Sequence, residues 1–177
     1  KIVKKKILVL GSSGQIGLHF RNYLENKKYL FKKFDLCEGK KFDLRKYNND
    51  LLEKSIKKCD YIFFLAFDIG GSRYIKEFQS SHKFLMNNLK IMANTFELLA
   101  KYKKPFLFAS RQMSNMSYSN YGLLKLLGER VSNQLNGNYV KFWNVYGIEK
   151  NLEKSHAITD FILMVLRYKK IKMLDRK

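Results

Sequence analysis

The feature that most constrains this chain is the segment KILVLGSSGQIGLHF, residues 6–20. Four apolar residues at 7–10 predict a buried strand, and three glycines follow where the apolar pattern changes to that of a helix. One glycine of such a turn makes the tight bend, one lets the backbone approach a diphosphate, and one lets helix and strand pack closely. The helix start adds free N–H groups and a partial positive charge. The pattern predicts a dinucleotide-binding turn at Gly11, Gly14 and Gly17, with a purely structural glycine loop as the alternative.

An acidic residue supports the dinucleotide interpretation. Asp35 closes a second predicted strand and lies 18 residues after Gly17. A carboxylate at this place accepts hydrogen bonds from the ribose hydroxyls of the adenosine half and repels a 2′-phosphate. We therefore expect NAD as the cofactor in preference to NADP, a preference that the neighbouring Lys32 and Lys33 weaken. Gln15 and Ile16 are expected to donate backbone N–H groups to the diphosphate.

The rest of the chain alternates between strand-like and helix-like patterns. Strands are predicted at 7–10, 31–34, 61–67, 105–110 and 139–145, and helices at 16–26, 49–57, 84–102, 121–135 and 160–168. Apolar strands without in–out alternation indicate a parallel sheet covered on both faces. We therefore predict the α/β class, with a Rossmann-type doubly wound parallel sheet flanked by helices. No repeat or linker divides the sequence, so residues 1–177 are expected to form one NAD(P)-binding domain.

Composition excludes several other classes of protein. The net charge of +20 fits a nucleic-acid surface, but the lysines are scattered in twos and threes, which favours a biased composition and no nucleic-acid partner. Two cysteines outside any CxxC pair and three dispersed histidines predict neither a disulfide framework nor a metal site. No apolar run has the length of a membrane span, and no signal peptide is recognisable, so we expect a soluble, cytoplasmic protein.

The glycine spacing GxxGxxG resembles that of the extended short-chain dehydrogenase/reductase superfamily, the NAD-dependent epimerases and dehydratases of nucleotide sugars. FDL at 42–44, FLAF at 64–67, NNLKIMANTFELLA at 87–100 and NVYG at 144–147 are similar to that family's motifs, in the same order. The resemblance implies that Asp43 contacts the adenine. The cofactor-binding residues that it implies, together with the turn, are Gly11, Ser13, Gly14, Gln15, Ile16, Gly17, Asp35, Asp43, Leu44, Leu65, Ala66, Phe67, Ala109, Tyr121 and Lys125.

Tyr121 and Lys125 are the candidate catalytic pair. Their four-residue spacing places both side chains on one face of a predicted helix. A tyrosine titrates near pH 10, and a nearby ammonium stabilises its phenolate so that it can accept a proton at lower pH. One such pair is expected by chance in a chain with eleven tyrosines, but this pair opens the helix after a predicted strand, as in the family. There the lysine also holds the nicotinamide ribose.

The third member of the family's catalytic set is a Ser or Thr at the end of the preceding strand. Here Ser110 is followed by Arg111 at the position of the second hydroxyl, and Ser114 and Ser117 are alternatives. Either Arg111 impairs catalysis, or its guanidinium meets the oxyanion in place of a hydroxyl.

The substrate side is less defined. Gly70 and Gly71 resemble a loop that approaches the sugar in GDP-fucose synthases and GDP-mannose 3,5-epimerases, and a plain flexible loop is the alternative. The epimerases' acid/base cysteine has no counterpart, which argues against 3,5-epimerisation. The substrate-binding residues implied are Gly70, Gly71, Arg111 and Asn144, whereas Trp143 is expected to pack.

These features predict an NAD-dependent epimerase, dehydratase or 4-keto reductase acting on a nucleotide-linked sugar. The alternative is a dinucleotide-binding module without catalysis. The family's C-terminal substrate-binding lobe is expected to be absent or truncated. The family also forms dimers through a helix bundle, and the apolar residues that recur at helical spacing serve either that bundle or the sheet: Met86, Leu89, Met92, Phe96 and Leu99.

Overall fold

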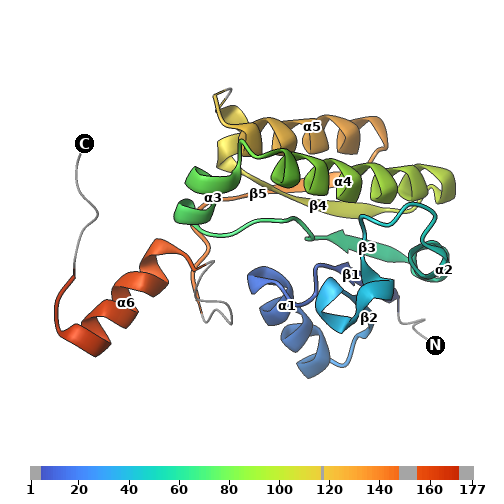
Figure 1. Cartoon of the computed structure of the whole chain (residues 1–177). Coiled ribbons are helices and arrows are strands. Elements are labelled where there is room, and N and C mark those ends of the chain that lie inside the picture. The colour runs from blue at the N-terminus through green and yellow to red at the C-terminus, as the bar shows by residue number, and fades with distance from the viewer. Residues whose placement is uncertain (1–4, 117, 148–154, 172–177) are drawn as a thin grey trace.

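The computed structural model describes residues 5–116, 118–147 and 155–171. Its described part contains a five-stranded, fully parallel sheet in the order β2-β1-β3-β4-β5 (Figure 1). The strands are β1 (Lys6–Leu10), β2 (Leu30–Phe34), β3 (Tyr61–Phe64), β4 (Phe106–Arg111) and β5 (Asn138–Phe142). This order reverses between β1 and β3, which makes that junction the switch point of a doubly wound sheet. The predicted α/β, Rossmann-type class is confirmed.

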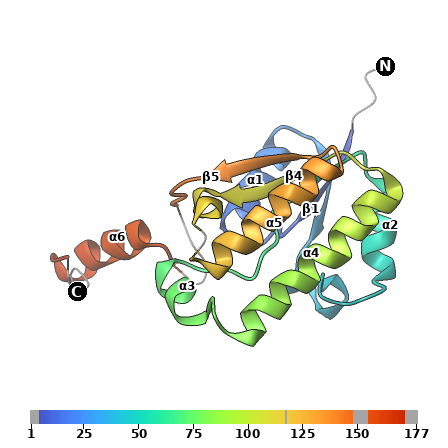
Figure 2. The same cartoon turned by 90° about the horizontal axis from the view of Figure 1, so that it is seen from above.

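Helices cover both faces of the sheet. They are α1 (Gln15–Asn26), α2 (Asp50–Lys58), α3 (Ser72–Phe78), α4 (His82–Tyr102), α5 (Asn120–Gln134) and α6 (Ala157–Tyr168). Helix α1 packs on one face through Phe20 and Leu24, whereas α2 and α4 contribute to the large core on the other face. Figure 2 shows α4 and α5 lying side by side over the strands. Three single-turn 3₁₀ helices complete the described elements: η1 (Leu36–Glu38), η2 (Lys40–Phe42) and η3 (Gln112–Asn115).

Side-chain caps fix where three of the helices begin. The Asn49 side chain accepts from the backbone of Leu51 and Leu52 at the start of α2. The Ser81 hydroxyl accepts from the Phe84 N–H at the start of α4, and the Ser119 hydroxyl accepts from the Gly122 N–H at the start of α5. A capping oxygen satisfies a backbone N–H that has no partner within the helix. The Ser119 cap fixes the first turn of α5, in which Tyr121 lies.

Several predicted boundaries were wrong. The strand predicted at 61–67 ends at Phe64. The Leu65 N–H donates the last hydrogen bond to β1, to Leu10 O at 2.9 Å. Beyond it the chain leaves the sheet, because the Asp68 N–H donates to the Asn88 side chain instead. The strand predicted at 139–145 ends at Phe142, and the last helix begins at 157 instead of 160. Helix α3 was not predicted at all.

The core between β3, β4 and α4 is aromatic. Phe64 lies 5.3 Å, between ring centroids, from both Phe96 and Phe108, with the rings at steep angles. Such edge-to-face pairs add to the free energy gained from burial alone. Of the apolar residues that recur on α4, Met92, Phe96 and Leu99 belong to this core, whereas Leu89 is exposed.

Helix α6 lies apart from the sheet in both views (Figures 1 and 2). Within the described part of the chain none of its residues is buried, and the ion pair between Arg73 and Asp160, at 2.8 Å, joins it to α3. Among the described helices, none is both long and apolar enough to cross a bilayer.

Substitution of Gly17 tests how closely α1 packs on the sheet. A Cβ at this position would overlap the Gly11 carbonyl oxygen, so we expect Gly17→Ala to lower the free energy of unfolding by about 2–3 kcal/mol. Gly14→Ala is the matched control, because its Cβ would meet only Gly11 O, at 3.5 Å, and should lower it by less than about 1 kcal/mol. Urea unfolding measures both, and equal losses would contradict the packing argument.

Candidate active site

A cavity of about 490 Å³ lies at the carboxyl ends of the strands. Its walls come from the glycine turn, the end of β2, the 42–45 segment, the 65–69 segment, the end of β4 and helix α5. Ligands of doubly wound sheets bind at this edge, beside the switch point. The cavity therefore combines segments that are far apart in the sequence.

The glycine turn forms one wall. Gly11 has a φ of +83°, and a Cβ there would lie 2.6 Å from Ala66 N, so this position requires glycine. Gly14 precedes α1 and provides no side-chain cap. The backbone N–H groups of Gln15 and Ile16 lie before the first intrahelical bond, which Leu18 N makes to Gly14 O at 2.8 Å. An uncapped helix start on a cavity wall suits an anion.

Asp35 stands at the end of β2, on the cavity wall. Its two carboxylate oxygens accept one backbone N–H each, from Ser13 and from Cys37, both at 2.9 Å. These bonds orient the carboxylate and leave lone pairs on each oxygen. The Gln15 Nε2 group lines the same wall and is buried without a partner. The residues present therefore fit the diphosphate and ribose of a dinucleotide.

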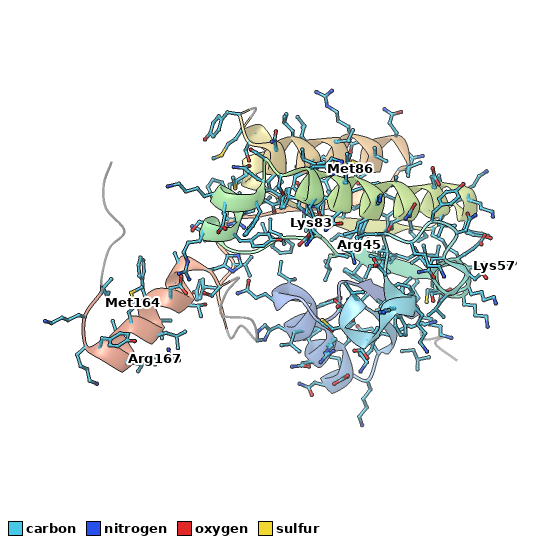
Figure 3. The ribbon with its side chains drawn as sticks, viewed as in Figure 1. Arg45, Lys57, Lys83, Met86, Met164 and Arg167 are labelled. Atoms are coloured by element: carbon cyan, nitrogen blue, oxygen red, sulfur yellow. The ribbon has the colours of Figure 1, made fainter. Side chains whose placement is uncertain are left out.

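Asp43 has a partner that the sequence did not suggest. Its carboxylate accepts three bonds from Arg45, from the backbone N–H at 2.9 Å, Nε at 2.8 Å and Nη2 at 2.7 Å. The hydrogen-bonded Arg45 side chain holds the pKa of the Asp43 carboxyl below its ordinary value. In Figure 3, Arg45 lies toward the middle of the molecule, whereas Lys57 and Arg167 lie at its edges. The Asp43 carboxylate thus faces the cavity beside a guanidinium.

Tyr121 and Lys125 both project from α5 into the cavity wall and are buried. The Lys125 ammonium donates to Ala109 O at 2.7 Å and lies 3.7 Å from the centroid of the Phe67 ring. Burial, aided by the charge of Arg111 and opposed by Glu129, lowers the pKa of Lys125 from 10.5 to about 7. Burial raises the pKa of the Tyr121 hydroxyl to about 12, although the Arg111 charge and hydrogen bond act in the opposite direction.

Ser110 lines the cavity, but its hydroxyl is already engaged. It donates to the buried Glu129 carboxylate, whose other oxygen pairs with Lys141 at 3.1 Å. A hydroxyl has one proton to donate, so Ser110 can only accept from a further group while this bond holds. Glu129 follows Lys125 by one helical turn, and its part in the site was not predicted.

Two further serines were candidates for the same role. Ser114 is buried with its Oγ unpartnered, and it is not among the described residues that line the cavity. Ser117 lies outside the described residues. Arg111, in contrast, lines the cavity beside Tyr121.

The proposed substrate glycines lie elsewhere. Gly70 and Gly71 are buried, and neither is among the described residues that line the cavity. A Cβ on Gly71 would overlap the Ser155 carbonyl oxygen, so its close approach serves packing within the chain. Asn144 is exposed and does not belong to that described lining either, whereas its neighbours Trp143 and Val145 do. Trp143, expected to pack, is 72% exposed.

Other lining residues had no sequence signal. His156 comes from the segment before α6. Asp68 lies in the segment after β3, where its carboxylate accepts from the Tyr74 hydroxyl at 3.0 Å and from Asn87 at 2.8 Å. In the described ranges, no group of three His, Cys, Asp or Glu side chains could hold a metal ion. Neither Cys37 nor Cys59 forms a disulfide.

The sequence matches the NAD dependent epimerase/dehydratase family over residues 7–176. The chain therefore belongs to this family, which is of the extended short-chain dehydrogenase/reductase type. A search of curated proteins finds no match.

Solved structures share the fold. An ADP-L-glycero-D-manno-heptose-6-epimerase from Helicobacter pylori superposes with a TM-score of 0.75 at 16% identity, over 95% of this chain and 65% of that one. MoeE5 in complex with UDP-glucose and NAD gives 0.74 at 21% identity, over 92% and 61%. A GDP-L-fucose synthetase from Naegleria fowleri bound to NADP gives 0.72 at 15% identity, over 94% and 63%. The chain thus spans less than two thirds of each of these proteins.

The pKa of Lys125 predicts a pH-dependent stability. The folded chain releases this proton above about pH 7, whereas an unfolded lysine keeps it up to 10.5, so the native state gains stability as the pH rises between these values. Lys125→Met lacks this titration. We therefore expect the free energy of unfolding of the native chain to rise, relative to that of the variant, by on the order of 4 kcal/mol across that range.

Urea unfolding at pH 6 to 10 measures this difference. Lys90→Met, which removes an exposed lysine from α4, is the matched control for the loss of one charge. A difference for Lys125→Met that stays constant with pH would contradict a lowered pKa.

Proposed function

We propose that this chain is the cofactor-binding and catalytic part of an NAD-dependent epimerase, dehydratase or 4-keto reductase acting on a nucleotide-linked sugar. The observation that supports the proposal best is one cavity lined by three kinds of group. They are an uncapped glycine turn, a carboxylate at Asp35 that can accept hydrogen bonds from ribose hydroxyls, and the buried pair Tyr121 and Lys125. Family membership supports the same chemistry. The reported complexes of MoeE5 with UDP-glucose and with UDP-glucuronic acid, each with NAD, support a nucleotide-linked sugar as substrate.

The preference for NAD rests on Asp35. The solved structures include complexes with NADP and complexes with NAD, so the fold alone does not distinguish the two cofactors. The Asp35 carboxylate is held by two backbone N–H groups on the cavity wall, where it would accept from ribose hydroxyls. The same negative charge would repel a 2′-phosphate.

The bound nicotinamide would supply a hydride acceptor and donor. Tyr121 would take the proton of the sugar hydroxyl as hydride leaves the carbon, and return it in the reverse step. Lys125 would hold the nicotinamide ribose from its position between Ala109 O and the Phe67 ring. Because both side chains are buried, water competes little with these contacts.

Tyr121→Phe tests the proposed base. We expect turnover of a nucleotide sugar to fall by at least about 100-fold, because general-base catalysis contributes that much or more. NAD affinity should stay close to that of the native chain, since the ring and its packing remain. Product analysis by mass spectrometry and calorimetry with NAD measure the two quantities. Native turnover in this variant would exclude Tyr121 as the base.

Gly14→Ala and Asp35→Asn test the cofactor site without any substrate. Gly14 lines the cavity, and a Cβ there would meet little protein, so NAD affinity should fall while the free energy of unfolding changes by less than about 1 kcal/mol. Asp35→Asn should weaken NAD binding and reduce the preference for NAD over NADP, because the charge that repels a 2′-phosphate is removed. Calorimetry with both nucleotides measures this, with Asp60→Asn at the far end of the sheet as the control. Unchanged NAD binding in both variants would contradict the site.

A second candidate function is a dinucleotide-binding module without catalysis. The bond from Ser110 to Glu129 favours it, because it engages the hydroxyl expected to act on the substrate. Such a module would bind NAD and turn over no nucleotide sugar. The mass of any nucleotide that copurifies with the native chain separates a cofactor alone from a cofactor with its sugar substrate.

We also propose a homodimer through α4 and α5. Leu89 on α4 and Leu123 and Leu127 on α5 are exposed, and the two helices lie side by side (Figure 2). Apolar residues on the outer faces of neighbouring helices suit a helix bundle with a second copy.

A further inference from the structure

The described hydroxyls near Tyr121 do not fill the role of a donor toward the substrate. Ser110 gives its proton to Glu129, and Ser114 is not part of the described cavity lining. A donor is nevertheless needed at the oxygen where negative charge develops, because that interaction lowers the barrier. The position expected to supply it carries Arg111.

Arg111 has the position of such a donor. It is the last residue of β4, it lines the same cavity as Tyr121, and its positive charge acts on the Tyr121 hydroxyl and lowers the pKa of that group. Its Nε is buried and has no hydrogen-bond partner. A buried donor without a partner is unfavourable unless a ligand supplies the acceptor. The guanidinium therefore lies on the cavity wall that Tyr121 shares, with one N–H that no protein oxygen accepts in the described part of the chain.

The other charged groups around Tyr121 are engaged differently. Lys125, on the same helix, donates to Ala109 O, and its Nζ lies 5.8 Å from the Tyr121 ring centroid. Glu129, one turn further, is paired with Lys141 from β5 and with Ser110. The positive charge that acts on the Tyr121 hydroxyl is thus that of Arg111, from β4.

We propose that Arg111 is a catalytic residue that replaces the Ser/Thr hydroxyl and takes over from Lys125 the stabilisation of the Tyr121 phenolate. This inference rests on the proposed function. An arginine keeps its proton throughout, so it acts as a fixed donor and a fixed positive charge. Lys125 then has the separate role of donating hydrogen bonds to the cofactor ribose and to the Ala109 carbonyl.

The proposed step balances as follows in the oxidative direction. Bound NAD⁺ would supply the hydride acceptor. The carbinol C–H bond would break and give up its hydride, while the hydroxyl O–H bond would break and its proton would pass to the Tyr121 phenolate. The sugar carbon would thus be oxidised to a ketone, and Tyr121 would become a neutral phenol. Arg111 donates N–H groups to both oxygens and exchanges no proton.

A 19F NMR titration tests the contact without any substrate. Tyr121 is replaced by 3,5-difluorotyrosine, whose phenol titrates closer to neutral pH, in the full chain saturated with NAD. With Arg111→Met we expect the midpoint of the titration to rise by about one pH unit or more, the effect of losing an adjacent opposite charge. Arg111→Lys, which keeps the charge, should shift it by less. Arg111→Gln gives the same expectation as the Met variant and replaces it if that variant does not fold.

Arg130→Met is the matched control, because it removes an exposed arginine from the same helix as Tyr121. We expect it to leave the midpoint unchanged. A shift in Arg111→Met of less than half the expected unit, or one that Arg130→Met reproduces, would overturn the proposal. A merely structural role for Arg111 would change the melting temperature and leave the midpoint where it is.

Turnover separates this proposal from the proposed function. If the native chain converts a nucleotide sugar, Arg111→Met should lower kcat by roughly 100- to 1,000-fold with NAD affinity retained. It should also move the rise of kcat with pH toward higher pH. If the native chain turns over no nucleotide sugar while the fluorine midpoint still shifts, the proposed function fails and the Arg111–Tyr121 contact stands. If turnover is found and the Met variant keeps native kcat, the inference about Arg111 fails alone.

Discussion

The close approach of α1 to the sheet is the constraint on which the rest of the structure depends. Gly17 has no side chain and therefore packs directly on the Gly11 carbonyl, and Gly11 in turn packs against the backbone at Ala66. These contacts bring the uncapped start of α1 to the same rim as the end of β2 and the segment after β3. A larger side chain at either position would overlap backbone atoms, so the backbone would have to shift and those walls would separate.

The opposite wall is organised by buried charge. Tyr121, Lys125 and Glu129 follow one another at four-residue spacing on the buried face of α5. Glu129 is balanced by Lys141 and Ser110, whereas Lys125 rests on a carbonyl and an aromatic ring. Buried charges must be paired or must shift their pKa. The helix shows both within two turns, because Glu129 is paired with Lys141 and burial lowers the pKa of Lys125 to about 7.

Local patterns predicted the parts of the site that depend on one segment. The glycine turn, Asp35 and the Tyr121–Lys125 pair each follow from spacing within a strand–helix unit, and all of them line the cavity. Contacts between distant segments could not be predicted from spacing within one segment. The packing of Gly71 on Ser155 joins residues 84 positions apart, and the bond from Ser110 to Glu129 joins β4 to α5. The strand at 61–64 stops early because 65–67 turn toward the cavity and core, which apolar character alone does not reveal.

The environment of Lys125 has a consequence for its reactivity. Because burial lowers its pKa to about 7, this lysine is an uncharged amine at neutral pH more often than an exposed lysine is. A desolvated neutral lysine is a nucleophile toward carbonyl compounds. We therefore expect an aldehyde that enters the cavity to form an imine with this side chain, which borohydride would trap.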